Sequence, residues 1–188
     1  LAGEDVTATR QAVRVQKGLA RTFQINTLFP DLTPIEAVSL AISERTGIAG
    51  NFWSRVAAQA AVVDEAFATL EKLRLADVAT RQTRTLAYGQ QRLLEIALAL
   101  AMKPKVLLLD EPAAGVPKDE SAALFQVIAG LPADISVLFI EHDMEIVFNF
   151  ATRIIVLVAG GVLLEDEPAV VRRDSRVREV YLGSSHHG

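Results

Sequence analysis

The chain has 188 residues, of which 51% are hydrophobic, and its 19 Lys and Arg against 23 Asp and Glu give a net charge of −4. This length fits one domain, or one domain with an inserted lobe, and the acidic balance argues against a protein that coats nucleic acid. The absence of cysteine excludes disulfides, thiolate metal sites and a cysteine nucleophile.

The first half of the chain is predicted to be mostly helical. Residues 18–24 favour a short strand that ends in a polar glutamine. A helix then begins at Pro34, because Thr33 is a preferred N-cap and Glu36 completes a capping box three residues later. With one break, the alanine-rich helical pattern continues and predicts an all-helical lobe. Its last apolar residues fall near helical spacing: Phe67, Leu70, Leu73 and Leu75.

The second half alternates predicted strands with predicted helices. We expect a strand at 105–112 followed by a helix at 119–131, and a strand at 136–143 followed by a helix at 144–151. A hairpin at 153–167 then turns on Gly160 and Gly161, and a last helix covers 169–183. Both strands are continuous apolar runs, typical of a parallel sheet buried on both faces. No apolar run approaches the ~20 residues that span a bilayer.

Two acidic residues follow the first buried strand, in the segment VLLLDEP. Ligands of parallel α/β sheets bind beside the carboxyl ends of the strands. Asp110 is therefore placed to hold a metal ion, and Glu111 to orient a water molecule. This pair suits Mg²⁺-assisted phosphoryl transfer. The alternative is a strand that simply ends in two acids before a proline turn.

Three further features carry chemistry only in combination. His142 follows the second strand and could donate a hydrogen bond to a phosphate, although a surface histidine is the simpler interpretation. Gln24 could offer its amide oxygen to a metal or a water, or could be merely solvated. The turn LAYGQ opens a long apolar helix, whose unpaired N–H groups and partial positive charge attract anions. That turn could equally be an ordinary helix start.

The order of these features resembles the nucleotide-binding subunit of ABC transporters. The match is closest to the branched-chain amino acid importer ATPases, the LivG-like group, through the segments ARTFQINTLF, YGQQRLLEIA, EPAAG, EHDM and YLG. It extends from Glu4 to Gly183. The resemblance implies an α/β, P-loop NTPase-like (RecA-like) parallel sheet with an inserted all-helical lobe. It also implies an ATPase that energises uptake of branched-chain amino acids or related small solutes.

The resemblance assigns a role to each motif. Glu111 is the catalytic base or water-positioning residue, and the catalytic His142 contacts the γ-phosphate of ATP. Asp110 and Gln24 bind the metal, Mg²⁺, and contact the nucleotide. The signature motif covers ATP held by a partner subunit and consists of Leu86, Ala87, Tyr88, Gly89 and Gln90.

The resemblance also implies domain limits and partners. We expect a partial ATPase core at 1–32, a helical lobe with the signature at 33–101, the remaining core at 102–183 and a tail at 184–188 that could derive from an expression tag. The lobe would dock transmembrane permease subunits, and a second copy or a paralogous ATPase subunit would complete a dimer. A solute-binding protein would act indirectly, and no nucleic acid is involved. The protein would lie in the cytoplasm, peripheral on the inner face of the cell membrane.

The chain also departs from the family. It contains no G-x-x-x-x-G-K-[ST] phosphate loop, so we expect a polypeptide truncated before Walker A, without the N-terminal strands and inactive alone. Ala87 replaces the signature serine, Pro117 stands where Asp or Asn is usual, and Leu98 where Arg is common. A second interpretation is a degenerate interaction module that docks a permease without ATP turnover. ATP binding would discriminate the two. DNA-repair ABC ATPases are disfavoured, since a long coiled coil would be needed before the signature.

Overall fold

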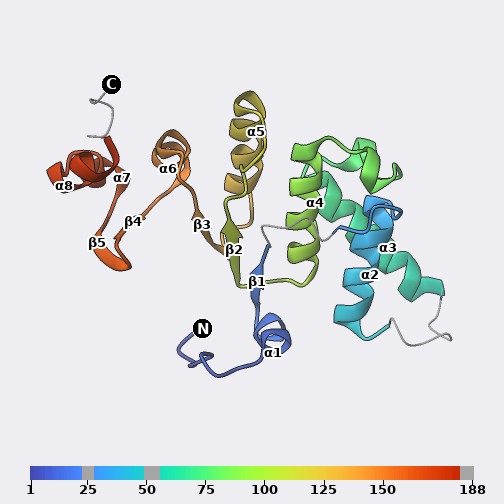
Figure 1. Ribbon diagram of the computed structural model, residues 1–188. Coiled ribbons are helices and arrows are strands. Elements are labelled where there is room, and N and C mark those ends of the chain that lie inside the picture. Colours follow the sequence, from blue (N-terminus) through green and yellow to red (C-terminus); the bar gives the residue numbers. More distant parts are fainter. Residues whose placement is uncertain (23–27, 49–55, 183–188) are drawn as a thin grey trace. The chain divides into compact units, whose positions relative to one another are not determined.

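The computed structural model describes residues 1–22, 28–48 and 56–182. The chain forms two compact units, Leu1–Ile140 and Glu141–Gly188. The first unit holds a parallel sheet with most of the helices, and the second holds a β-hairpin with short helices (Figure 1). Among the described residues, no helix is both long and apolar enough to cross a membrane.

The sheet of the first unit has three parallel strands in the order β1-β2-β3. They are β1 (Leu19–Arg21), β2 (Val106–Asp110) and β3 (Ser136–Ile140). Leu107 and Leu109 of the central strand are buried, at 0% and 1% exposure, as a continuous apolar run predicts. The predicted burial of β3 is wrong, because β3 is the last strand in the order and its Leu138 and Ile140 are 52% and 59% exposed. Asp110 pairs in register with Ile140, so the acidic end of β2 lies beside the end of β3.

Two helices flank the strands of this sheet along the chain. Helix α5 (Lys118–Ala129) follows β2, and its fully buried Phe125 packs edge-to-face on Phe139 of β3, with ring centroids 5.1 Å apart. Helix α1 (Gln11–Gln16) precedes β1 and was not predicted, since its sequence buries no residue. Gly18 between them has a φ of +97°, and a Cβ there would lie 3.1 Å from the Lys105 side chain. Glycine thus allows β1 to enter the sheet close to β2.

The predicted all-helical segment is confirmed. Helices α2 (Pro34–Thr46), α3 (Val56–Lys72) and α4 (Tyr88–Ala101) pack against one another, with 3₁₀ turns η1 (Ala76–Val78) and η2 (Thr83–Thr85) between α3 and α4 (Figure 1). The capping box is also confirmed: the Thr33 hydroxyl accepts from the N–H of Glu36, whose carboxylate accepts from the N–H of Thr33 at 2.8 Å. Leu70, Leu73 and Leu75 are fully buried. Phe67, which falls near the same helical spacing, is 45% exposed.

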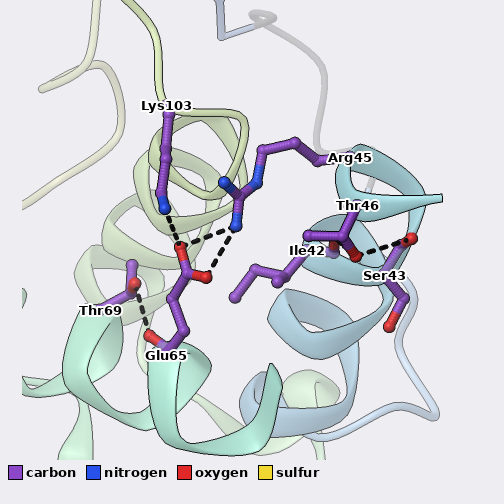
Figure 2. A network of polar contacts seen from close by, with 7 residues as sticks. All are labelled: Ile42, Ser43, Arg45, Thr46, Glu65, Thr69 and Lys103. Carbon is purple, nitrogen blue, oxygen red and sulfur yellow. Dashed lines mark hydrogen bonds and ion pairs between the residues drawn. The ribbon is translucent and has the colours of Figure 1, made fainter. Parts of the chain in front are cut away.

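An ionic network ties α2 and α3 to the segment after α4 (Figure 2). One guanidinium nitrogen of Arg45 donates to both oxygens of Glu65, at 2.8 and 2.7 Å, and the Lys103 ammonium lies 3.1 Å from the same carboxylate. Burial raises the pKa of Glu65, but hydrogen bonds from Lys103 and Arg45 and their positive charges outweigh it. The net pKa lies below the usual value of 4.5.

Replacing Glu65 with glutamine should remove a pH-dependent part of the stability. A carboxyl with a lowered folded-state pKa stabilises the fold above its unfolded pKa, near 4.5, and loses this contribution as the pH falls through the folded pKa. We expect a loss of about 1 kcal/mol at neutral pH, since solvent screens a carboxylate that is one-third exposed. Denaturant titrations at neutral and acidic pH measure it, with the exposed Glu71→Gln as control. A loss equal at both pH values would contradict the prediction.

The second unit is a hairpin covered by short helices. Its elements are α6 (Met144–Phe150), β4 (Ile154–Val158), β5 (Gly161–Asp166), α7 (Pro168–Val171), α8 (Ser175–Val177) and a π-helical turn η3 (Arg178–Leu182). Its core consists of Ile154, Val156, Val171 and Val177. The hairpin is confirmed, although the two left-handed residues of its turn are Ala159 and Gly160, one position earlier than expected.

The predicted last helix is not continuous. The Asp174 carboxylate accepts from the N–H groups of Arg176 and Val177 and starts α8 as a new helix. A side-chain hydrogen bond from Arg176, with these backbone bonds, lowers the pKa of Asp174 to about 2. A side chain that caps a backbone in this way competes with continuation of the preceding helix.

Candidate functional site

The acidic pair lies where the sequence predicts it, at the carboxyl end of the central strand. Asp110 is the last residue of β2, and Glu111 opens the turn that follows. Glu111 has a φ of +46°, in the left-handed region that is uncommon for side chains other than glycine. Its N–H donates to the carbonyl of Ile140 at 3.0 Å, which holds the turn against β3. Such backbone strain concentrates at functional sites.

The Asp110 carboxylate faces the neighbouring strand. A guanidinium nitrogen of Arg21 on β1 donates to Asp110 Oδ2 at 3.0 Å, and the Asp110 side chain is 25% exposed. This ion pair was not predicted, although Arg21 lies in the motif segment ARTFQINTLF. Parallel register places Arg21 opposite Leu108, two residues before Asp110.

These residues fit a magnesium ion that shares its ligands with a nucleotide. Mg²⁺ is usually held by one or two carboxylates together with phosphate oxygens and waters. Across the described part of the chain, no group of three or more His, Asp or Glu side chains could hold a metal by itself. One partly exposed carboxylate at Asp110 suits the shared arrangement. The second predicted ligand, Gln24, lies outside the described residues.

The predicted anion site lies at the start of α4. Leu86 is buried and anchors the turn, and Ala87 occupies the N-cap position without a side-chain oxygen to cap the helix. The Gln90 side chain accepts from the N–H of Ala87 at 3.0 Å, which is only the reverse half of a capping box. First-turn N–H groups left without a side-chain cap suit an anionic ligand.

The structure brings the signature turn against the turn that follows Glu111. The side chain of Tyr88 fills the space where a Cβ of Gly115 would lie, which would be 3.0 and 3.2 Å from two ring carbons and 3.3 Å from the hydroxyl oxygen. A Cβ at Gly89 would lie 3.0 Å from a carboxylate oxygen of Glu120 at the start of α5. Two motifs that are 20 residues or more apart in the sequence thus share one surface of the first unit.

Tyr88 is the exposed end of a chain of polar contacts along α4 whose other two members are buried. Its hydroxyl accepts from an Arg92 nitrogen at 2.5 Å, and Arg92 also donates to Glu95 at 2.9 Å. The Arg92 and Glu95 side chains are 7% and 9% exposed. Burial raises the pKa of Glu95, because it penalises the carboxylate charge more than Arg92 stabilises it. These contacts were not predicted, although spacings of four and three residues place Tyr88, Arg92 and Glu95 on one helix face.

His142 lies at the start of the second unit. It is exposed and follows β3 by two residues. The next residue, Asp143, begins α6 by accepting from the N–H groups of Glu145 and Ile146. The helix predicted after this histidine is therefore confirmed, while the role of His142 stays a prediction.

The fold is similar to solved ATP-binding cassettes. The MJ1267 cassette in its ADP conformation superposes with a TM-score of 0.76 at 29% identity, covering 96% of this chain and 74% of that one. A nucleotide-free cassette from an ABC transporter gives 0.75 at 29% identity, covering 95% and 74%. A parallel α/β sheet with this likeness defines an ATP-binding cassette, and the predicted P-loop NTPase-like fold class is confirmed.

The family follows from sequence comparison. The model of the family described as ABC transporter matches residues 1–114. The protein BraF of Pseudomonas aeruginosa, a high-affinity branched-chain amino acid transport ATP-binding protein, is 34% identical over 98% of this chain and 75% of its own length. LivG of Salmonella typhimurium, described in the same words, is 38% identical over 89% and 69%. The chain belongs to the ABC transporter family, as an ATP-binding subunit homologous to the branched-chain amino acid importer ATPases.

Proposed function

We propose that this chain energises the import of branched-chain amino acids or closely related small solutes through permease subunits. The observation that carries the proposal is the likeness to BraF along 98% of the chain. Complete members of the family bind ATP, generally with Mg²⁺, and hydrolyse it, and relatives of this kind work with membrane permeases. The helical lobe at 33–101 would dock a cytoplasmic part of the permease, which would hold this subunit at the inner face of the membrane.

Hydrolysis would use Asp110 and Glu111 at the end of β2 together with Gln24 and His142. Asp110, with Gln24, would hold Mg²⁺, which when bound neutralises charge on the phosphates. Glu111 would orient and deprotonate the attacking water, and its left-handed backbone supports such a role. His142 would donate a hydrogen bond to a γ-phosphate oxygen. Without the cation, the Arg21 guanidinium would pair with the Asp110 carboxylate, since a guanidinium nitrogen lies 3.0 Å from Asp110 Oδ2.

The signature turn would act in trans. The segment from Leu86 to Gln90 would cover ATP held by a second copy or a paralogous subunit. Because Ala87 has no hydroxyl, the contact would rely on backbone N–H groups, including that of Gly89, and on the partial charge of a 14-residue helix. Leu86 would contribute as a buried anchor rather than as a direct ligand.

We further propose that the 188-residue chain does not turn over ATP alone. Its sequence contains no phosphate loop, whose backbone N–H groups and lysine would cradle the phosphates. The non-catalytic docking module considered above gains no support from any comparison.

Reconstitution tests the proposal, with this chain joined to a phosphate-loop segment of the family and assembled with permease subunits in proteoliposomes. We expect ATP turnover that rises with the uptake of labelled leucine, and no such coupling with labelled lysine as the control solute. The isolated 188-residue chain should show no turnover above buffer. Turnover that is insensitive to every branched-chain amino acid would contradict the substrate class. Assembly without any ATP turnover would contradict the enzymatic assignment.

A further inference from the structure

The contact between Tyr88 and Gly115 joins two motifs within one chain. Tyr88 opens the signature helix α4, and Gly115 lies in the turn that begins at Glu111. We infer that Tyr88 is a positioning residue, which fixes the turn carrying Glu111 relative to the start of α4. This inference rests on the proposed catalytic role of Glu111, but the positioning itself can be measured without any nucleotide.

The turn is fixed at two places. At its first residue, the N–H of Glu111 donates to Ile140 of β3 at 3.0 Å. The N–H of Ala114 then donates to Glu111, and that of Val116 to Ala113, both at 3.0 Å, so the turn is internally bonded. At its far side, Gly115 adopts a φ of +78° beneath the ring of Tyr88. A turn bonded within itself and held at both ends moves as one piece.

Arg92, one turn further along α4, holds the side chain of Tyr88 in place. Its hydroxyl accepts from Arg92, and the Arg92 guanidinium carbon lies 4.9 Å from the centre of the ring, within cation–π distance. Arg92 is itself buried and bonded to Glu95 on the next turn of α4. The tyrosine ring is therefore a rigid extension of α4, although 38% of the residue remains exposed at the signature surface.

This arrangement couples the two motifs mechanically. The first unit cannot shift the start of α4 without moving the ring of Tyr88 across Gly115, because the gap there leaves no room even for a Cβ. A nucleotide covered by the signature in trans would thereby influence the turn that holds Glu111 in cis. The coupling uses side chains of this chain only.

Amide hydrogen exchange in the full 188-residue chain tests the inference. In Tyr88→Ala, exchange at the Glu111, Ala114 and Val116 amides should accelerate by at least about tenfold, since losing an aromatic contact weakens local packing by more than the ~1.4 kcal/mol that this factor represents. Amides of α2 should keep their wild-type rates. Phe67→Ala is the matched control, because it removes a similarly exposed aromatic ring from α3. It should leave the turn unchanged.

A second variant separates the ring from the hydroxyl. Tyr88→Phe keeps the ring over Gly115 and should keep turn exchange close to wild type, even if the loss of the Arg92 hydrogen bond lowers global stability. Unchanged turn exchange in Tyr88→Ala, or faster exchange spread evenly over the first unit, would overturn the inference. So would turn exchange in Tyr88→Phe that matches Tyr88→Ala. None of these outcomes depends on ATP turnover, so a failure of the proposed function would be seen separately.

Discussion

Replacing Glu95 with alanine should lower the free energy of unfolding by about 3–5 kcal/mol, because removing one member of a buried ion pair leaves the other charge uncompensated. Arg92 would then lie at 7% exposure with only the Tyr88 hydroxyl among the partners described above. One further atom of each side chain, Arg92 Nε and Glu95 Oε1, is already buried without a hydrogen-bond partner. No other described hydrogen bond of Arg92 would therefore compensate for the loss of the Glu95 carboxylate.

Glutamine at the same position should behave differently. It keeps the shape and an oxygen that can accept from Arg92, and it carries no charge to bury. Burial raises the folded-state pKa of Glu95 above 4.5, so the native state binds the proton more tightly than the unfolded chain does. This tighter proton binding stabilises the native state below the unfolded pKa, and the stabilisation is lost as the pH rises through the folded pKa. Glu95→Gln, which does not titrate, should therefore gain stability relative to wild type between acidic and neutral pH.

Denaturant titrations followed by far-ultraviolet circular dichroism measure both variants. The exposed Glu44→Ala on α2 is the matched control for the first, and should change stability by less than about 0.5 kcal/mol. A Glu95→Ala loss as small as that of the control would show that the pair is not buried in solution. If the stability of Glu95→Gln relative to wild type did not rise between acidic and neutral pH, the carboxylate would be stabilised, not penalised, by its surroundings.

Local sequence signals predicted the elements whose causes are local. The capping box depends on the four consecutive residues from Thr33 to Glu36, and β2 and β3 follow from unbroken apolar runs. The prediction of one continuous last helix was wrong because Asp174 caps a new helix within it. Apolar periodicity favours continuation and the capping side chain favours a new start, and periodicity alone does not decide between them. Helical spacing alone does not say which apolar residues of α3 are buried, and Phe67 is 45% exposed while Leu70 is fully buried.

The residues of the candidate site also divide into those predicted from local sequence and those that depend on tertiary packing. Asp110 and Glu111 were found because they follow a buried strand. The Arg21 ion pair needed the strand order and register, and the contact of Tyr88 with Gly115 needed the packing of α4 on the turn after β2. Neither follows from spacing along the chain. Only the line of Tyr88, Arg92 and Glu95 on one helix face could have been noticed from the sequence.

In the reconstituted transporter whose ATPase subunit carries the joined phosphate-loop segment, replacing Glu111 with glutamine should lower ATP turnover by two to four orders of magnitude, the usual contribution of a general base. Glutamine has the size of glutamate but cannot accept a proton from water, so the turn, its bond to Ile140 and nucleotide binding should persist. Turnover and ATP binding are measured side by side in proteoliposomes.

The control for Glu111 is a carboxylate outside the site. Glu145 lies exposed in the first turn of α6, and Glu145→Gln should leave turnover within about twofold of wild type, as surface substitutions away from special features usually do. Full turnover in Glu111→Gln would remove this residue from the reaction. Equal losses of turnover and of ATP binding would assign it to nucleotide binding instead. Loss of turnover with binding retained is the one result that makes Glu111 the base, because only the chemical step then depends on its charge.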